Sequence, residues 1–293
     1  MLKILLLGKN GQVGWELQRS LSCLGNVIAL GHDEADFSHP TDLAAVVAQH
    51  KPHVIVNVAA YTAVDHAESM ATQAYKINAE SPAILAQAAK IYGALLVHYS
   101  TDYVFDGSGT KPWQEADVTN PLNVYGTSKL KGEQAIIHSG CQFLIFRTSW
   151  VYGTRGGNFA KTILRVAQER DELKVINDQF GAPTGADWLA DMTNRAIIQT
   201  LADPHKQGLY HATVSGETTW HGYASYVIEQ AKLLNYPIKA QTICAVPTLD
   251  FPTPAQRPSN SRLNTRKLQL AFNVHCPPWQ AGVLRLLQSI TAV

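Results

Sequence analysis

Three side chains near the middle of the sequence are of types that can pass a proton to a carbonyl oxygen. Tyr125 and Lys129 are four residues apart, which places a phenol and an ammonium on one face of a helix. The ammonium favours the phenolate, so we expect it to lower the pKa of Tyr125 from about 10 towards neutrality. Thr101 follows an apolar run, and its hydroxyl can polarise the same carbonyl group. A tyrosine and a lysine at this spacing are common by chance, but together with Thr101 they predict acid–base chemistry on a ketone.

Three glycines directly after the first apolar run can bring the backbone close to a pyrophosphate. Gly8, Gly11 and Gly14 are spaced by three residues, and a helical pattern begins at the same point. The start of such a helix offers unpaired N–H groups and the positive end of its dipole to an anion. The small residues in the run 57–62 would let the chain pass close under the same ligand. We therefore expect a dinucleotide site of the extended short-chain dehydrogenase type.

The segment after the second apolar run is where an acidic residue would bind the adenosine ribose of NAD. Asp33 and Asp36 lie at similar distances from the glycine motif, so the spacing selects neither of them. Lys9 and His32 could instead accept the 2′-phosphate of NADPH. The sequence predicts a nicotinamide dinucleotide without choosing between NADH and NADPH.

These side chains need a scaffold that brings them to one place. Apolar runs at 2–7, 27–30, 54–58, 95–99 and 143–146 alternate with helical patterns at 11–24, 43–50, 67–92 and 124–138. This alternation predicts an α/β fold with a Rossmann-like, doubly wound parallel sheet. Right-handed crossovers put the carboxyl ends of the strands on one edge, where ligands bind.

Past residue 148 the alternation becomes irregular and proline-rich segments interrupt it. We expect residues 1–148 to form the dinucleotide-binding domain and residues 149–293 to form mainly a smaller α/β lobe for the substrate. Helices are expected at 158–170, 186–201, 223–234 and 280–290. A strand near 209–214 is expected to rejoin the first sheet.

Composition indicates an ordinary globular protein. The chain has 293 residues, of which 46% are hydrophobic and 16% charged, with a formal net charge of +1. Because no dense run of lysine and arginine occurs, we expect no nucleic-acid binding. The four cysteines lie far apart, which suggests neither a zinc site nor a disulfide framework. The apolar opening is too short to span a bilayer, so we expect a cytoplasmic protein without a membrane segment.

Motifs spread over nearly the whole chain carry a family resemblance. They occupy residues 8–17, 57–65, 100–105, 121–129, 147–152, 175–185 and 257–263. Together they resemble the dTDP-4-dehydrorhamnose reductase family of the extended short-chain dehydrogenase/reductase superfamily. The resemblance implies NAD(P)H-dependent reduction of the C4 ketone of dTDP-4-dehydro-6-deoxy-L-mannose to dTDP-L-rhamnose. This is the last step in making a sugar donor for cell-envelope polysaccharides such as lipopolysaccharide.

The resemblance also implies roles for single residues. It places Thr101, Tyr125 and Lys129 at the catalytic positions. The cofactor site is expected to comprise Gly8, Gly11, Gln12, Val13, Gly14, Asp36, Phe37, Ala60, Tyr61 and Thr62, together with Tyr125 and Lys129. Tyr61 replaces a more usual histidine, which puts that side-chain contact in doubt.

The expected substrate site includes Thr101, Asp102, Trp150 and Arg257. Trp150 is placed there by the resemblance. The Arg257 guanidinium, in a loop rich in proline and serine, has the planar shape that suits a diphosphate, and a salt bridge within the loop fits it equally well.

Some members of the family are described as magnesium-linked dimers, and Glu16, Asp187 and Asp191 resemble the acidic positions involved. The resemblance thus raises Mg²⁺ and a homodimer as expectations. Acidic residues on two helices are also the ordinary pattern of solvated faces, and the sequence shows no closed cage for the metal.

Other residues with functional side chains are expected to be structural. His98 and His211 lie within apolar strands. Trp220, Tyr223 and Tyr226 have helical spacing, which is typical of packing.

Three other functions fit part of the pattern. A nucleotide-sugar dehydratase needs an acid and a base, usually Asp-Glu after the threonine, whereas here Asp102-Tyr103 follows. An epimerase would keep NAD⁺ tightly bound, whereas a reductase must exchange its cofactor in every turnover. A non-catalytic, cofactor-binding regulatory subunit could lose Tyr125 or Lys129, yet both are present.

Overall fold

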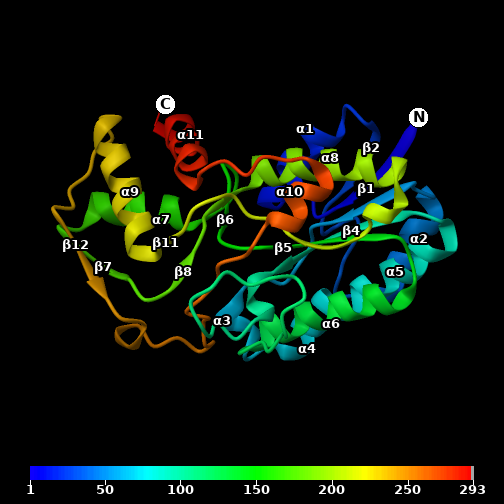
Figure 1. Ribbon diagram of the computed structural model, residues 1–293, viewed down its shortest axis with the longest axis horizontal. Coiled ribbons are helices and arrows are strands. Elements are labelled where there is room, and N and C mark those ends of the chain that lie inside the picture. Colours follow the sequence, from blue (N-terminus) through cyan, green and yellow to red (C-terminus); the bar gives the residue numbers. More distant parts are fainter. Residues whose placement is uncertain (292–293) are drawn as a thin grey trace.

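The computed structural model describes residues 1–291 and consists of a large lobe around a parallel sheet and a smaller lobe beside it (Figure 1). The six strands of the sheet lie in the order β10-β5-β4-β3-β1-β2. They are β1 (Leu2–Leu7), β2 (Gly25–Leu30), β3 (Val54–Asn57), β4 (Leu95–Thr101), β5 (Phe143–Thr148) and β10 (Gly208–His211). The predicted Rossmann-like sheet with a smaller α/β lobe is confirmed.

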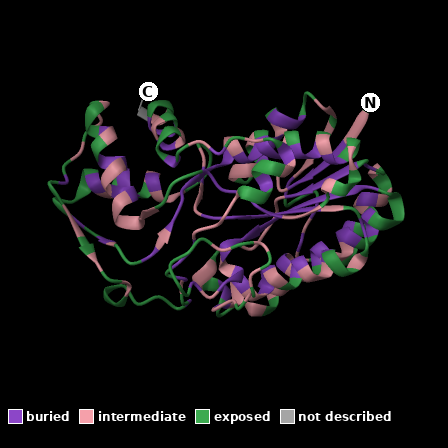
Figure 2. Cartoon of the chain, in the orientation of Figure 1, coloured by how far each residue is buried: buried purple, intermediate pink, exposed green. Residues whose placement is uncertain are grey.

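The central strands are apolar throughout because both faces of the sheet are covered. Ile4 and Leu6 face helices α1 (Gln12–Leu21), α8 (Ala186–Ala202) and α10 (Arg266–Phe272). Leu5 and Leu7 face α2 (Pro40–His50), α5 (Ser81–Tyr92) and α6 (Val124–Ser139). Figure 1 shows the first group above the sheet and α5 and α6 below it, and Figure 2 shows the strands buried between them.

The single helix expected over residues 67–92 is wrong in part, because this segment is divided. It contains α3 (Val64–Ala67), α4 (Ala71–Tyr75), a π-helical turn (Lys76–Glu80) and α5. The π-helical turn carries the buried Asn78, which bonds both the N–H and the carbonyl of Tyr61 and the hydroxyl of Ser128. The break thus ties the residues after β3 to α6.

The smaller lobe has its own core. Helices α7 (Phe159–Glu169), α9 (Trp220–Leu233) and α11 (Trp279–Thr291) pack beside β7 (Glu172–Ile176), which pairs in parallel with β12 (Thr242–Val246). Two short pairs form separate two-stranded sheets: β6 (Val151–Tyr152) with β9 (Thr184–Gly185) in parallel, and β8 (Phe180–Gly181) with β11 (Thr218–Thr219) antiparallel. Tyr223 and Trp279 are buried in its core.

The chain crosses between the lobes more than once. Helix α8 packs on α1, and α10 joins the same layer, although both follow residue 148. The expected returning strand is β10, which pairs in parallel with β5. In the part of the chain described, no helix is long and apolar enough to cross a membrane.

Candidate active site

A cleft of about 540 Å³ opens at the carboxyl edge of the sheet, where the strand order changes direction between β1 and β3. Its lining includes most of the residues expected to bind a dinucleotide: Gly8, Gly11, Gln12, Val13, Gly14, Asp36, Phe37, Ala60, Thr62, Tyr125 and Lys129. Tyr61 turns its hydroxyl to His66 at 2.7 Å. The cleft lies at the position where doubly wound folds bind their ligands.

The glycines of the first turn are required by close backbone contacts. Gly8 has φ +95°, and a Cβ there would lie 2.8 Å from the backbone nitrogen of Ala59. A Cβ on Gly14 would lie 2.1 Å from the carbonyl oxygen of Gly8. Gly11 is the N-cap of α1 and has no side chain to occupy the first N–H groups of the helix. This turn fits a pyrophosphate at the start of α1.

Two buried hydroxyl groups in the cleft lack a hydrogen-bond partner within the described residues. Ser100 Oγ and Thr148 Oγ1 are buried, and neither has a hydrogen-bond partner among residues 1–291. Both residues line the cleft. Buried polar groups are normally paired, so these atoms also support a polar ligand here.

Charged groups at the adenosine end are paired with one another. Asp36 accepts hydrogen bonds from the backbone and hydroxyl of Ser38, each at 2.8 Å, and lies 3.0 Å from His39 Nδ1. The bond from the Ser38 backbone is the main cause that lowers the pKa of Asp36. Lys9 Nζ lies 2.8 Å from an oxygen of Glu34.

Tyr125 stands at the start of α6 beside the end of β4. Asn123 caps this helix by accepting a hydrogen bond from the Gly126 nitrogen at 2.8 Å. A Cβ on Gly126 would lie 2.2 Å from the carbonyl oxygen of Tyr103, so the glycine lets α6 approach the 3₁₀ turn (Asp102–Val104) that follows β4. The ring of Tyr125 is partly exposed, while its phenol oxygen is buried and hydrogen-bonded to the Thr101 side chain.

Burial raises the pKa of Tyr125 to about 12, and the hydrogen bond to Thr101 only partly opposes this. The lowering expected from Lys129 is therefore wrong for this state of the chain. The reason is geometric: Lys129 Nζ donates to the carbonyl oxygen of Tyr99 at 2.5 Å and lies 3.3 Å from His98 Nε2. The amine is turned towards β4.

Lys129 is 2% exposed, and burial lowers its pKa to about 8. Glu133, one turn along α6, opposes this shift. Arg147 of β5 holds both oxygens of Glu133, at 2.9 and 2.7 Å, in a buried ion pair. Lys129 can thus exchange a proton near neutral pH.

Asp102 is buried at the end of β4. Burial raises its pKa to about 7, against hydrogen bonds from Ser261 and Thr101. Thr101 Oγ1 donates to one carboxylate oxygen at 3.1 Å, and the other oxygen has no partner within the described residues. A carboxyl group in this position can be protonated at neutral pH.

The smaller lobe holds a second pocket, of about 380 Å³. Its lining comprises Phe159, Ile163, Lys174, Val175, Ile176, Gln179, Trp220, Thr248, Phe251, Thr253 and Arg257. Trp150, at φ +48°, stacks on Trp220 with ring centroids 3.6 Å apart. Gln179 accepts a hydrogen bond from Trp220 Nε1 at 3.0 Å. The sequence predicts that Trp220 only packs in a core, but its ring also lines this pocket.

Arg257 joins the two lobes. Its Nη2 lies 2.6 Å from an oxygen of Asp65, which follows α3's first residue, and Nη1 bonds the other oxygen at 3.1 Å. Nη1 also donates to Thr253 at 2.6 Å. The guanidinium is partly exposed, so a diphosphate can reach it only in competition with Asp65.

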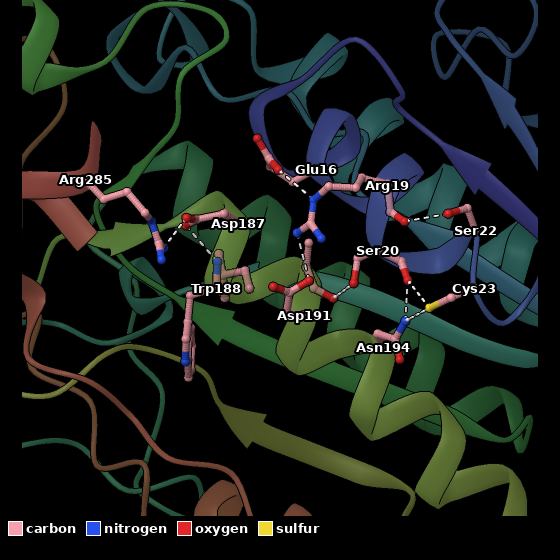
Figure 3. A network of polar contacts seen from close by, with 12 residues as sticks. Glu16, Arg19, Ser20, Ser22, Cys23, Asp187, Trp188, Asp191, Asn194 and Arg285 are labelled. Atoms are coloured by element: carbon pink, nitrogen blue, oxygen red, sulfur yellow. Dashed lines mark hydrogen bonds and ion pairs between the residues drawn. The ribbon is translucent and has the colours of Figure 1, made fainter. Parts of the chain in front are cut away.

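The acidic residues suggested as magnesium ligands lie beside the lobe junction (Figure 3). Asp191 pairs with Arg19 at 2.8 Å, Asp187 pairs with Arg285, and Glu16 lies 3.6 Å from Arg19. Within residues 1–291, no group of three or more histidine, cysteine, aspartate and glutamate side chains is arranged to hold a metal. Arginines thus pair with both aspartates in the single chain, and magnesium binding stays a prediction.

Sequence reasoning did not single out Ser100, Thr148 or Gln179, and it placed His98 among structural residues. Ser100 and Thr148 each lie at the end of a strand that reaches the cleft edge. That position is the signal that could have found them. Gln179 and His98 depend on contacts with distant segments.

Comparisons with known proteins agree with this geometry. The family described as "RmlD substrate binding domain" matches residues 2–292. The dTDP-4-dehydrorhamnose reductase of Escherichia coli K12 is 54% identical, over 99% of this chain and 98% of its own. A solved dTDP-4-dehydrorhamnose reductase of Clostridium acetobutylicum is 35% identical with a TM-score of 0.90, covering 99% of both chains. That of Bacillus anthracis, in complex with NADP, is 34% identical with a TM-score of 0.91, covering 99% of this chain and 100% of its own.

A match to the family over nearly every residue, and relatives that cover the whole chain, leave no large segment unaccounted for. The chain belongs to the RmlD substrate binding domain family, with the dTDP-4-dehydrorhamnose reductases as its relatives.

Proposed function

We propose that this chain reduces the C4 ketone of dTDP-4-dehydro-6-deoxy-L-mannose to dTDP-L-rhamnose, using a nicotinamide dinucleotide. The observation that carries the proposal is the meeting of Thr101, Tyr125 and Lys129 at one edge of a cleft with a dinucleotide-type glycine turn. The names of relatives that are 47–54% identical support the substrate. We also infer that the enzyme works in the cytoplasm, in keeping with its four free cysteines.

The side chains divide the proton chemistry. The bound cofactor supplies the hydride that reaches C4. Tyr125 donates its phenolic proton to the ketone oxygen, which becomes more basic than a phenolate as charge develops on it. Thr101 has a single hydroxyl proton, which it donates to Asp102 in the free chain; with the ketone bound, it turns this proton to the same oxygen. Lys129 binds the nicotinamide ribose and restores the proton of Tyr125.

The two pockets divide the ligands. The cleft of the larger lobe holds the cofactor through residues 8–14, 36–37 and 60–62 and through Tyr125 and Lys129. The sugar lies against Thr101 and Asp102. The nucleotide end extends into the pocket of the smaller lobe, where Trp220, stacked on Trp150, offers an apolar face and Arg257 offers a cation.

Magnesium and a homodimer come from the resemblance. A metal shared between two copies would have to displace Arg19 from Asp191 and Arg285 from Asp187. Sedimentation of the protein with Mg²⁺ and with a chelator tests this: a dimer that dissociates when the metal is removed supports a shared site. An unchanged mass contradicts it.

The decisive experiment follows the loss of NADPH absorbance when the purified chain meets the 4-keto sugar nucleotide. The expected product is dTDP-L-rhamnose, formed in equal amount to NADP⁺. A regulatory subunit would leave NADPH unchanged. An epimerase would instead convert a nucleotide sugar without net oxidation of added NADPH and would retain bound NAD⁺ through purification.

A further inference from the structure

A buried line of polar side chains runs from β3 through β4 to Lys129. Asn57 and His98 are paired positions of these strands, and each is 1% exposed. Asn57 Nδ2 lies 3.1 Å from His98 Nδ1, and His98 Nε2 lies 3.3 Å from Lys129 Nζ. His98 therefore stands between a fixed amide and the amine of the active site.

The orientation of Asn57 determines which ring nitrogen of His98 carries a proton. The Ala59 N–H donates to Asn57 Oδ1 at 3.0 Å, so the amide nitrogen of Asn57 must face His98. An amide nitrogen only donates, which makes Nδ1 of His98 an acceptor. Burial and the neighbouring Lys129 lower the pKa of His98 well below its usual value, so the ring is neutral. A neutral ring with a bare Nδ1 has its proton on Nε2.

The proton on Nε2 points at Lys129. An ammonium has three donors and no acceptor, so it gains nothing from a facing N–H group. An uncharged amine has a lone pair and can accept this hydrogen bond. His98 in this tautomer thus favours the uncharged form of Lys129, in the same direction as burial does.

The other charged and titratable groups around Lys129 do not cancel this preference. Glu133 on α6 favours the ammonium, but Arg147 on β5 holds both of its oxygens. Tyr125 on α6 and Asp102 after β4 are both hydrogen-bonded to Thr101. His98 is the side chain that meets the amine directly.

We propose that His98 is a positioning residue for Lys129: with its tautomer fixed by Asn57, its Nε2–H group stabilises the amine that is left when Lys129 gives up a proton. In each turnover Tyr125 loses its proton to the ketone oxygen, and the phenolate must regain one. An N–H bond of Lys129 breaks, the O–H bond of Tyr125 re-forms, and the amine takes a proton from water. This inference rests on the roles proposed above for Tyr125 and Lys129.

The tautomer can be measured without any assay of activity. Nitrogen-15 spectra of histidine-labelled protein distinguish a protonated from a bare ring nitrogen, and a His98→Gln variant identifies the signals of His98. We expect Nε2 protonated and Nδ1 bare across neutral pH in the native chain. A proton on Nδ1 in the native chain would by itself overturn the inference.

The variant Asn57→Asp should reverse the preference. A carboxylate accepts both the Ala59 N–H and an Nδ1–H, which leaves Nε2 free to accept from the ammonium of Lys129. Because the charged lysine is the proton donor, activity falls as pH rises through its pKa. The alkaline limb of kcat should therefore move up by about one pH unit in the variant, the scale of one hydrogen bond.

Asn26→Asp is the matched control, since it adds the same charge at an exposed position of β2 and should leave the limb in place. A switched tautomer with an unmoved alkaline limb in Asn57→Asp would show that His98 does not act on Lys129. A different result, normal turnover in variants of Tyr125 or Lys129, would contradict the catalytic roles proposed for these two residues.

Discussion

The two proposed ligand-binding regions are assembled in different ways. In the cofactor cleft, the functional residues follow strand ends and open helices, as Gly8 follows β1 and Tyr125 opens α6. In the smaller lobe's pocket, Phe159, Gln179 and Arg257 come from segments that are far apart in the chain. Local sequence therefore determines the first site, whereas long-range packing determines the second.

The two regions also differ in the burial and ion pairing of their charged side chains. Lys129 is buried, and its pKa lies near the pH at which it must work. Arg257 is partly exposed and already paired with Asp65. We infer that the larger lobe performs the chemistry and that the smaller lobe mainly binds the sugar nucleotide.

The largest effect is expected from Tyr125→Phe, which removes the proton donor. Turnover should fall by roughly 10²–10⁴, the usual contribution of a positioned acid, while cofactor affinity stays nearly normal. Steady-state rates and NADPH titration measure the two quantities. Tyr92→Phe, which removes a phenol hydroxyl at an exposed position of α5, is the matched control. Near-normal turnover in Tyr125→Phe would remove this residue from the mechanism.

Lys129→Met should damage both binding and chemistry, because we assign the amine to the ribose and to Tyr125. We expect turnover to fall by about 10² and the Kd for NADPH to rise by about tenfold, on the scale of a lost charge-assisted hydrogen bond. Lys131→Met, at an exposed position of the same helix, provides the control. An unchanged Kd would limit Lys129 to proton transfer.

The same difference between the two regions explains what the sequence could predict. Gly8–Gly14 and the Tyr125/Lys129 pair are local patterns, and the strands that position them are continuous apolar runs. The pairing of Asn57 with His98 depends on the register of β3 against β4, which no local pattern contains. Trp220 has the spacing of a packing residue. That its ring lines a pocket is seen only in the folded chain, where Phe251 and Arg257 line the same pocket. The arginines that pair with Asp187 and Asp191 were likewise invisible to a search for acidic residues.

Arg257→Ala tests the smaller lobe. The KM for the sugar nucleotide should rise by about 10- to 100-fold, because a charge-assisted hydrogen bond of about 1.5–3 kcal/mol is lost, while NADPH affinity stays nearly intact. If the diphosphate contact also aligns the ketone with Tyr125, kcat falls as well.

Asp65→Asn separates substrate binding by Arg257 from its ion pair between the lobes, since it weakens the pair and leaves the guanidinium for the diphosphate. Arg165→Ala, on the exposed face of α7, is a control for the loss of an arginine. Titration of each ligand decides the outcome. Weaker NADPH binding with unchanged sugar-nucleotide binding in Arg257→Ala would reverse the assignment of the lobes.

The smallest effect concerns the choice of cofactor at the adenosine end of the cleft. Asp36 can accept a ribose hydroxyl and Lys9 can bind a 2′-phosphate, but each is engaged by neighbours, Asp36 by Ser38 and Lys9 by Glu34. We therefore expect kcat/KM for NADPH and for NADH to agree within about tenfold. Glu34→Gln releases Lys9 and should shift the ratio towards NADPH by about two- to fivefold, the scale of an exposed ion pair.

The shift in Glu34→Gln should shrink as salt is added, because exposed charges are screened. Glu169→Gln, which removes an exposed carboxylate on α7, should leave the ratio unchanged. If Glu34→Gln has no effect on the ratio at low salt, Lys9 does not reach the 2′-position. His32, which also lines the cleft, then becomes the residue to change.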